Sequence, residues 1–328
     1  MAIDHFFDDF YYVVRDQESS VTTFCLREAF KLLGFALDAD KSQVPAEVAE
    51  VLGVCFNMQS LSSQKILMIQ PRATRVVNLG VIIDSILQAD AMPHAGAASL
   101  LGKFGFLCST MFGKVGRSCT GPLRDYLKGE PASPLPPHVV MTLKLMKILV
   151  HVAKPRKCFV HDTRSPILLY TDASDVPERG CNRWIVGAVL IHNENLRYTH
   201  YIVPQTIIDR WLPKETHMGQ LELLACPLAL ATWHDLLRSA AVLHFVDNDS
   251  AAAGLVRGFS PKRDSSAIIG DYWILAATHE IDIYIDRVES KSNISDGPSR
   301  LDFTLLETLK GHWTPPRIDF LAANSFSV

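Results

Sequence analysis

The spacing of apolar positions divides the chain into two regions of different character. In the first region, helical spacing predicts helices at 20–33, 73–91, 97–111 and 139–152, and Gly34 ends the first of them. Short runs of aromatic and β-branched residues predict strands at 10–14 and 52–58. The proline-rich run from Pro131 to Pro137 is the clearest linker, and Pro155 ends the helix that follows it.

The second region has the pattern of a sheet with helices on its faces. Apolar runs predict strands at 167–171, 184–192, 197–203, 242–246 and 281–288. Helical spacing predicts helices at 219–237, at 250–256 with Ser250 as the cap, and from Ser265 or Ser266 to 276. This order of elements predicts a mixed β-sheet in the α/β class.

Length and composition fit a protein with buried cores. The 328 residues suggest two domains or three small ones, and 48% of them are hydrophobic. No apolar run approaches the roughly 18–20 residues of a membrane span. The first ten residues lack the basic region of a signal peptide, and the seven scattered cysteines favour a reducing compartment. We therefore expect an intracellular protein, cytoplasmic or nuclear and not secreted, with no membrane partner.

Charge is informative through its distribution, since the net charge is only -3. Between residues 60 and 128 the chain has 8 cations and 3 acids, which gives 8 - 3 = +5. Such a stretch is either a solvated basic face or a contact surface for a nucleic-acid duplex. Its candidate nucleic-acid-binding residues are Lys103, Lys114, Arg117, Arg124 and Lys128.

Four acids in the second region occupy distinctive places. Asp172 and Asp247 end predicted strands, and Glu222 and Asp296 open predicted helices. Carboxylates at strand ends and helix starts can meet at one edge of a sheet, where their repulsion calls for divalent cations. Two such ions can activate a water and stabilise the leaving oxygen of a phosphodiester. Each acid taken singly also has an ordinary structural explanation, as a strand end, a first-turn acid or a helix cap.

The order of these acids resembles the ribonuclease H superfamily. The strings that carry the resemblance are Tyr-Thr-Asp-Ala-Ser at 170–174, Glu-Leu-Leu-Ala at 222–225, Val-Asp-Asn-Asp-Ser at 246–250 and Asn-Ile-Ser-Asp-Gly-Pro-Ser-Arg at 293–300. The string at 293–300 looks like the ending typical of retrotransposon versions, and the string at 246–250 is similar to the DIRS-type and gypsy-like retroelement branch. The resemblance implies hydrolysis of RNA in RNA–DNA hybrids, with Asp172, Glu222, Asp247 and Asp296 as catalytic ligands of Mg²⁺ or Mn²⁺.

The chain departs from this pattern in three places. Ser295 replaces an alanine before the last acid, and Pro227 falls where an interior proline costs about 3 kcal/mol. The proline is compatible with a helix that begins near Glu222 or is kinked. His279 precedes the last strand instead of following it, so it is not assigned the turnover role of the histidine found in cellular enzymes.

The first region resembles the later part of a reverse transcriptase. Phe6-Phe-Asp-Asp-Phe10 is similar to the palm hairpin whose acids bind catalytic metal, which implies Asp8 and Asp9 as metal ligands. The segments 33–42, 51–56 and 97–107 look like the following palm segment, the primer grip and the thumb helix. The resemblance implies a partial palm and thumb at 1–125, a connection at 126–160, a ribonuclease H-like domain at 161–305 and a C-terminal tail at 306–328.

A reverse transcriptase also needs another palm aspartate and fingers, for which there is no room before Asp8. We expect that this chain alone does not extend a primer on an RNA template, and that a partner could supply the missing N-terminal polymerase half. The main alternative is an inactive relic that only binds nucleic acid, which a hybrid-cleavage assay distinguishes. An integrase or transposase would use three acids without Glu222, and an integrase would normally bring a zinc-binding His/Cys segment.

Overall fold

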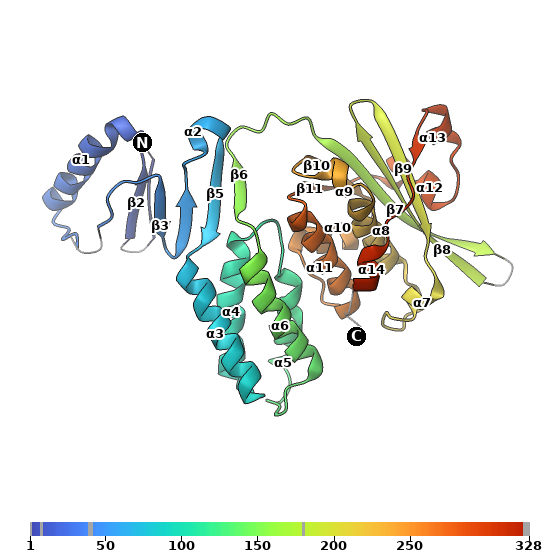
Figure 1. Ribbon diagram of the computed structural model, residues 1–328, viewed down its shortest axis with the longest axis horizontal. Coiled ribbons are helices and arrows are strands. Elements are labelled where there is room, and N and C mark those ends of the chain that lie inside the picture. The colour runs from blue at the N-terminus through green and yellow to red at the C-terminus, as the bar shows by residue number, and fades with distance from the viewer. Residues whose placement is uncertain (1, 7–8, 39–41, 179–180, 324–328) are drawn as a thin grey trace.

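The computed structural model describes residues 2–6, 9–38, 42–178 and 181–323. Figure 1 shows an elongated molecule, with the N-terminal elements at one end, a group of helices in the middle and a large sheet at the other end. The described part forms a mixed α/β fold, which confirms the predicted class.

The first region contains two small sheets and most of the longer helices. A two-stranded sheet pairs β1 with β2, and a four-stranded sheet has the order β3-β4-β5-β6. The strands are β1 (Ala2–Phe6), β2 (Asp9–Val13), β3 (Val48–Val51), β4 (Val54–Asn57), β5 (Ile66–Pro71) and β6 (Arg156–Phe159). The helices are η1 (Asp16–Glu18), α1 (Ser19–Leu32), α2 (Leu61–Gln64), α3 (Ala73–Ala89), α4 (His94–Thr110), η2 (Arg117–Cys119), α5 (Thr120–Tyr126) and α6 (Pro137–Val152).

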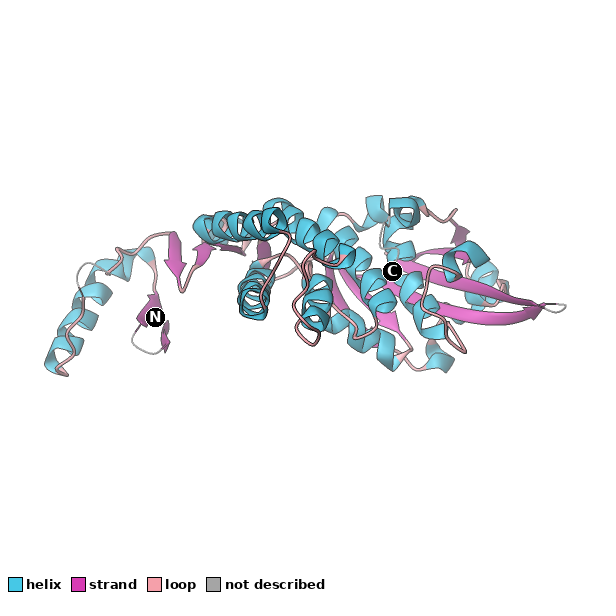
Figure 2. Ribbon diagram, turned by 90° about the horizontal axis from the view of Figure 1, so that it is seen from below, coloured by secondary structure: helices cyan, strands magenta, loops and turns pink. Residues whose placement is uncertain are grey.

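The second region is built on a six-stranded sheet of order β11-β10-β7-β8-β9-β12. Its strands are β7 (Ile167–Glu178), β8 (Cys181–His192), β9 (Asn195–Ile202), β10 (Ala241–Val246), β11 (Asp282–Arg287) and β12 (His312–Trp313). Its helices are α7 (Gln205–Ile208), α8 (Met218–Thr232), α9 (His234–Leu237), α10 (Asp249–Arg257), α11 (Arg263–Thr278), η3 (Ser290–Ser292), α12 (Asp296–Ser299), α13 (Thr304–Thr308) and α14 (Asp319–Ala323). Figure 2 shows the long strands of this sheet extending away from the helices of the first region.

The hydrophobic core of the sheet continues into the helices of the first region. Buried residues of α8 and α11 pack against β7, β8 and β10 in the same cluster as buried residues of α3 to α6. A separate cluster on another part of the sheet packs Leu306 of α13 against Val189, Leu196 and Tyr198. The helices α12 and α13 therefore cover β8 and β9 apart from the main core (Figure 1).

Several sequence predictions are confirmed and some need correction. The five predicted sheet strands are present, and the alternation of Ile283 and Ile285 with exposed neighbours is seen in β11. The predicted cap Ser250 is wrong, because Asn248 accepts the hydrogen bond from the Ala251 N–H at 3.0 Å. The predicted helix at 219–237 is divided into α8 and α9 at Trp233.

Two positional predictions for the acids also need correction. Asp172 does not end its strand, because β7 continues to Glu178 in antiparallel pairing with β8. Glu222 does not open its helix, because α8 begins one turn earlier at Met218. Pro227 accordingly lies in the interior of α8, where its missing N–H removes one helical hydrogen bond.

The described cysteine side chains are all free thiols, and most of them are buried. Among the described helices, none combines the length and the apolarity that crossing a membrane requires.

Gly187 in β8 allows α12 to lie directly on the sheet. A Cβ atom at this position would lie 2.9 Å from the Pro298 carbonyl carbon and 3.0 Å from the Ser295 oxygen, and closer still to the Ser299 nitrogen. These are backbone atoms, so no side-chain rotation can relieve the contact. Gly187 also pairs in register with Asp172, which places α12 immediately beside that carboxylate.

We expect Gly187→Ala to destabilise the fold by about 1–3 kcal/mol, since α12 must move away from the sheet to admit a methyl group. Gly102→Ala on α4 is the matched control, because a Cβ there has no atom within 4 Å. Chemical denaturation of both variants measures the effect. Equal stability of the two variants would show that α12 is not seated on Gly187.

Candidate metal centre

The site begins where the parallel pairing of β7 and β10 stops. The register of the two strands ends at Val246 and Thr171, and β7 then continues with β8 alone. Asp172 and Asp247 are the next residues on the two strands, so their side chains lie next to each other at the end of the shorter strand. The two carboxylates thus lie where β10 leaves the sheet and β7 continues with β8 alone.

Glu222 of α8 completes a cluster of three carboxylates. One oxygen atom from each of Asp172, Glu222 and Asp247 lies within 4.8 Å of the others. Asp172 and Glu222 are only 4% and 6% exposed, and Asp247 is partly exposed. This cluster is therefore open to solvent on the side of Asp247 and buried on the other side.

The proximity and burial of these groups oppose their ionisation. Burial raises the pKa of Glu222 to about 9, and repulsion from Asp172 and Asp247 adds to the shift. Burial likewise raises the pKa of Asp172 to about 6, although a hydrogen bond from Ser299 acts in the opposite direction. The backbone of Ala173 acts in the opposite direction on Glu222 and lowers its pKa.

Asp296 approaches this cluster from α12. It lies close enough to Asp172 for their repulsion to raise the pKa of Asp172. Its Oδ1 accepts a hydrogen bond from Arg300 Nε at 2.6 Å, and its side chain is 47% exposed. Asp296, like Asp247, is thus partly exposed, and among the described contacts of the four predicted ligands it is the one with an arginine partner.

Hydrogen bonds hold α12 against β7. Ser299 Oγ donates to Asp172 Oδ2 at 2.5 Å, and Ser174 Oγ donates to the Ser299 carbonyl. Asn293 Nδ2 donates to the Thr171 carbonyl at 3.1 Å, while Asn293 Oδ1 accepts from Ser295 Oγ at 2.6 Å. The bonds from Ser299, Ser174 and Asn293 join the α12 segment to β7, the strand that carries Asp172, whereas the bond between Ser295 and Asn293 stays within that segment.

A divalent cation fits this arrangement of oxygen atoms. Glu222 Oε2 is buried, and among the described residues it has no hydrogen-bond partner. An unpartnered buried carboxylate oxygen is costly unless a cation or proton compensates it. The donor set contains only carboxylates, which are ligands that Mg²⁺ and Mn²⁺ accept. The residues present therefore suit a hard divalent ion.

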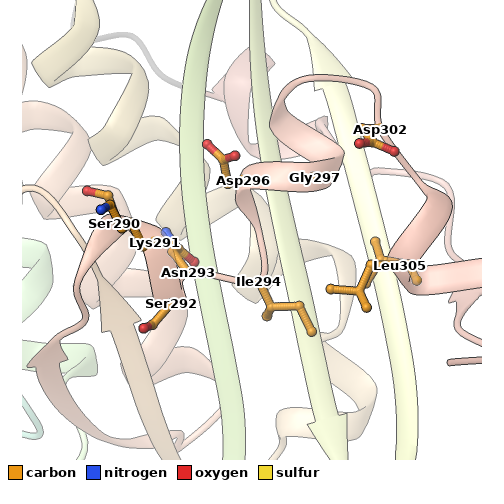
Figure 3. Close-up of a pocket in the computed structure, with 10 residues that line it drawn as sticks. Ser290, Lys291, Ser292, Asn293, Ile294, Asp296, Gly297, Asp302 and Leu305 are labelled. Atoms are coloured by element: carbon orange, nitrogen blue, oxygen red, sulfur yellow. The ribbon is translucent and has the colours of Figure 1, made fainter. Parts of the chain in front are cut away.

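A pocket of about 490 Å³ lies beside the cluster. Figure 3 shows Asp296 on one side of it and Asp302 and Leu305 on the other, with Lys291 and Asn293 along the segment that leads into α12. Among the lining residues, Asp296 is the one that belongs to the four predicted acids. The carboxylate triad itself lies outside this pocket, where β10 ends beside β7.

The predicted nucleic-acid-binding residues lie in different places. Arg117 Nη1 donates to the Arg257 carbonyl at 3.4 Å, and Lys114 and Arg117 both lie against Gly258. The guanidinium of Arg124 stacks over the ring of Phe259, with 4.6 Å between the Arg124 Cζ atom and the ring centroid. Lys128 is paired with Asp125, and Lys103 is an exposed residue of α4.

A composite basic surface follows from these contacts, formed by Lys114, Arg117, Arg124, Arg257 and Arg263. The sequence did not predict Arg257 and Arg263 as part of this surface. They belong to the second region, and only tertiary contacts bring them beside the basic residues of the first region. Burial, with repulsion from Arg117 and Arg156, lowers the pKa of Lys114. Arg263 shares Asp125 with Lys128, so one acid partly neutralises this surface.

The two acids predicted near the N-terminus remain a prediction. Asp8 lies outside the described residues, and Asp9 is the first residue of β2.

Comparison with known proteins gives similarity to solved structures only. No protein-family model and no curated protein matches the chain. The chain is similar to a foamy viral protease-reverse transcriptase in complex with dsDNA, with 14% identity, a TM-score of 0.38 and coverage of 88% of this chain and 55% of that chain. It is also similar to the same viral protein in complex with an RNA/DNA hybrid, with 11% identity, a TM-score of 0.34 and coverage of 92% and 58%. The chain thus spans about half the length of these structures, and similarity this low assigns no function.

We expect Glu222→Gln to stabilise the metal-free protein, increasingly so as the pH rises. Above the ordinary pKa of 4.5 the unfolded chain loses the Glu222 proton, whereas the folded chain keeps it up to about 9. Wild-type stability therefore falls between these two values, and the amide removes that loss. One pKa unit corresponds to about 1.4 kcal/mol, so a gain of a few kcal/mol is expected at pH 8.

Thermal unfolding between pH 5 and pH 9 with a chelator measures this effect. Glu307→Gln on α13 is the control, since that carboxylate is exposed. Parallel pH profiles for wild type and Glu222→Gln would contradict the burial of an uncompensated carboxylate.

Proposed function

We propose that this chain is a divalent-metal-dependent nuclease that hydrolyses the RNA strand of RNA–DNA hybrids. The observation that supports it most is the meeting of Asp172, Glu222 and Asp247 oxygens within 4.8 Å, together with the unpartnered Glu222 Oε2. The choice of RNA–DNA hybrid follows from the resemblance of the four acid-bearing strings to ribonuclease H.

The chain's own residues would divide the work between holding metal and placing the substrate. Asp172, Glu222 and Asp247 would hold Mg²⁺ or Mn²⁺, and Asp296 would contribute from the solvent side. Ions in such a site lower the pKa of water and stabilise the leaving oxygen of a phosphodiester. The buried side of the cluster, closed by α8 and by the bond from Ser299, keeps solvent from the inner carboxylate oxygens.

In this proposal the composite basic surface binds the same duplex. Helix α10 begins two residues after Asp247 and ends at Arg257, so its nine residues span about 13 Å at 1.5 Å per residue. Successive phosphates of one strand advance by about 3.4 Å along the helix axis, so this distance corresponds to roughly four nucleotide steps along that axis. A duplex whose scissile phosphate meets the carboxylates would thus reach the basic surface with neighbouring phosphates.

We expect the purified chain to cleave the RNA strand of a hybrid when Mg²⁺ or Mn²⁺ is added, and not in the presence of a chelator. Asp247→Asn should reduce the rate by at least about a hundredfold, because the amide cannot supply the negative charge that holds the ions. Denaturing gel analysis of a labelled hybrid measures the rate, and the same duplex made only of DNA tests the preference for RNA.

Hybrid binding without cleavage by the folded wild type would favour the inactive nucleic-acid-binding protein instead. Equal cleavage by wild type and Asp247→Asn would point to a contaminating nuclease and remove support for the proposal.

We expect Arg117→Gln combined with Arg257→Gln to weaken hybrid binding and to lower its salt dependence. Each lost phosphate contact should reduce the slope of log K against log salt by about 1. Fluorescence anisotropy at several salt concentrations measures the slope, and Lys31→Gln on α1 controls for the loss of a distant exposed charge. An unchanged slope in the double variant would exclude this surface as the duplex contact.

A further inference from the structure

A chain of buried polar side chains lies beneath the carboxylate cluster. The hydroxyl of Tyr272 on α11 lies 2.8 Å from His244 Nδ1, and His244 Nε2 lies 3.0 Å from Thr171 Oγ1. All three residues are completely buried, with exposed fractions of 0%. The chain therefore connects α11, β10 and β7 through the interior of the protein, where polar side chains are costly unless each is hydrogen-bonded.

The same chain continues to the helix that carries Glu222. Thr171 Oγ1 lies 3.6 Å from Cys226 Sγ, and Cys226 Sγ donates to the Glu222 carbonyl at 3.4 Å. The Thr171 carbonyl accepts the hydrogen bond from Asn293, which belongs to the segment leading into α12. Thr171 is thus the point where contacts from β10, α8 and α12 meet.

The positions of these residues relative to the four acids are regular. Thr171 directly precedes Asp172, and Cys226 follows Glu222 by one helical turn. His244 precedes Asp247 by three residues and Asn293 precedes Asp296 by three residues. Thr171 lies on the strand that carries Asp172. The segments that carry the other three acids each contact Thr171, through Cys226, His244 and Asn293.

His244 can serve both neighbours because it is neutral. Burial lowers its pKa to about 3, so at neutral pH the imidazole has one N–H donor and one acceptor nitrogen. One of these meets Tyr272 and the other meets Thr171, which leaves both ring nitrogens satisfied. The His244 ring is therefore held in one orientation by a hydrogen-bond partner on each side.

We infer that Thr171, held by His244 and Tyr272, is a positioning residue that sets the relative places of the carboxylates for divalent metal. The inference rests on the proposed metal-dependent nuclease function and names the residues that organise its site. Groups that orient metal ligands from behind typically change metal affinity or activity by about 10–100-fold when removed.

The test compares two isosteric changes of buried threonines in the same sheet. Thr171→Val removes the central hydroxyl of the network. Thr199→Val on β9 is the control, because Thr199 is also 0% exposed and its Oγ1 has no hydrogen-bond partner among the described residues. Thr171→Ser keeps the hydroxyl and should restore the wild-type behaviour.

Two quantities are measured for each variant. The first is the Mn²⁺ concentration that gives half of the maximal rise in Tm, which reports binding without catalysis. The second is hybrid cleavage, analysed as kcat and KM. For Thr171→Val we expect about a tenfold higher half-saturating Mn²⁺ concentration and about a tenfold lower kcat, with KM for the hybrid unchanged. Thr199→Val and Thr171→Ser should stay within about twofold of wild type on the same scale.

The outcomes separate this inference from the proposed function. Equal Mn²⁺ half-saturation in Thr171→Val and Thr199→Val overturns the inference, as does a Thr171→Ser variant as impaired as Thr171→Val. If Thr171→Val does not fold, Tyr272→Phe gives the same comparison, because it removes the hydroxyl at the far end of the network. The expected rise in the half-saturating Mn²⁺ concentration is then smaller. A wild type that binds Mn²⁺ but does not cleave hybrid contradicts the function alone, and one without any Mn²⁺-dependent rise in Tm contradicts both.

Discussion

The repulsion among Asp172, Glu222 and Asp247 is the constraint on which the rest of the second region depends. Their oxygen atoms lie within 4.8 Å of one another, and two of the three side chains are almost fully buried. A fold gains nothing in stability from such an arrangement, since like charges in a poorly solvated place oppose each other. The function that we propose accounts for its presence, because a divalent cation held by oxygen ligands alone would reverse the repulsion.

The surrounding structure holds these carboxylates in place despite their repulsion. Strand β10 ends at Val246 while β7 continues, so Asp172 and Asp247 lie together beyond the last parallel pair. Gly187 admits the backbone of α12 onto the sheet, and Ser299 bonds to Asp172 from that side. The helices of the first region share the core beneath the sheet, so the composite basic surface is fixed relative to the carboxylate cluster.

The sequence predicted the elements of the second region better than the details of its site. Strong apolar runs located the strands, and the four acids could be placed in order along the elements, although Asp172 lies inside β7 and Glu222 lies inside α8. The continuation of β7 past Asp172 could not be predicted, since it depends on where β10 stops and not on local pattern. A glycine inside an apolar strand indicates that another backbone approaches closely. Gly187 could therefore have predicted that a segment such as α12 packs against this strand.

The features that were missed all depend on contacts between distant segments. Thr171, His244 and Tyr272 have no shared motif in the sequence, and each alone is an ordinary residue of a strand or helix. The pairing of β6 with β5 joins residues about 90 positions apart, which no local pattern reveals. The basic surface likewise needed Arg257 and Arg263 to come beside Arg117 and Arg124, although the charge excess at 60–128 did indicate part of it.

Anomalous X-ray diffraction from crystals soaked in Mn²⁺ tests the central claim most directly, because it locates the ion without assuming any activity. Our account predicts an anomalous difference peak among the carboxylates of Asp172, Glu222 and Asp247 that disappears in crystals of Glu222→Gln. Crystals with no peak at these carboxylates under saturating Mn²⁺ would contradict it.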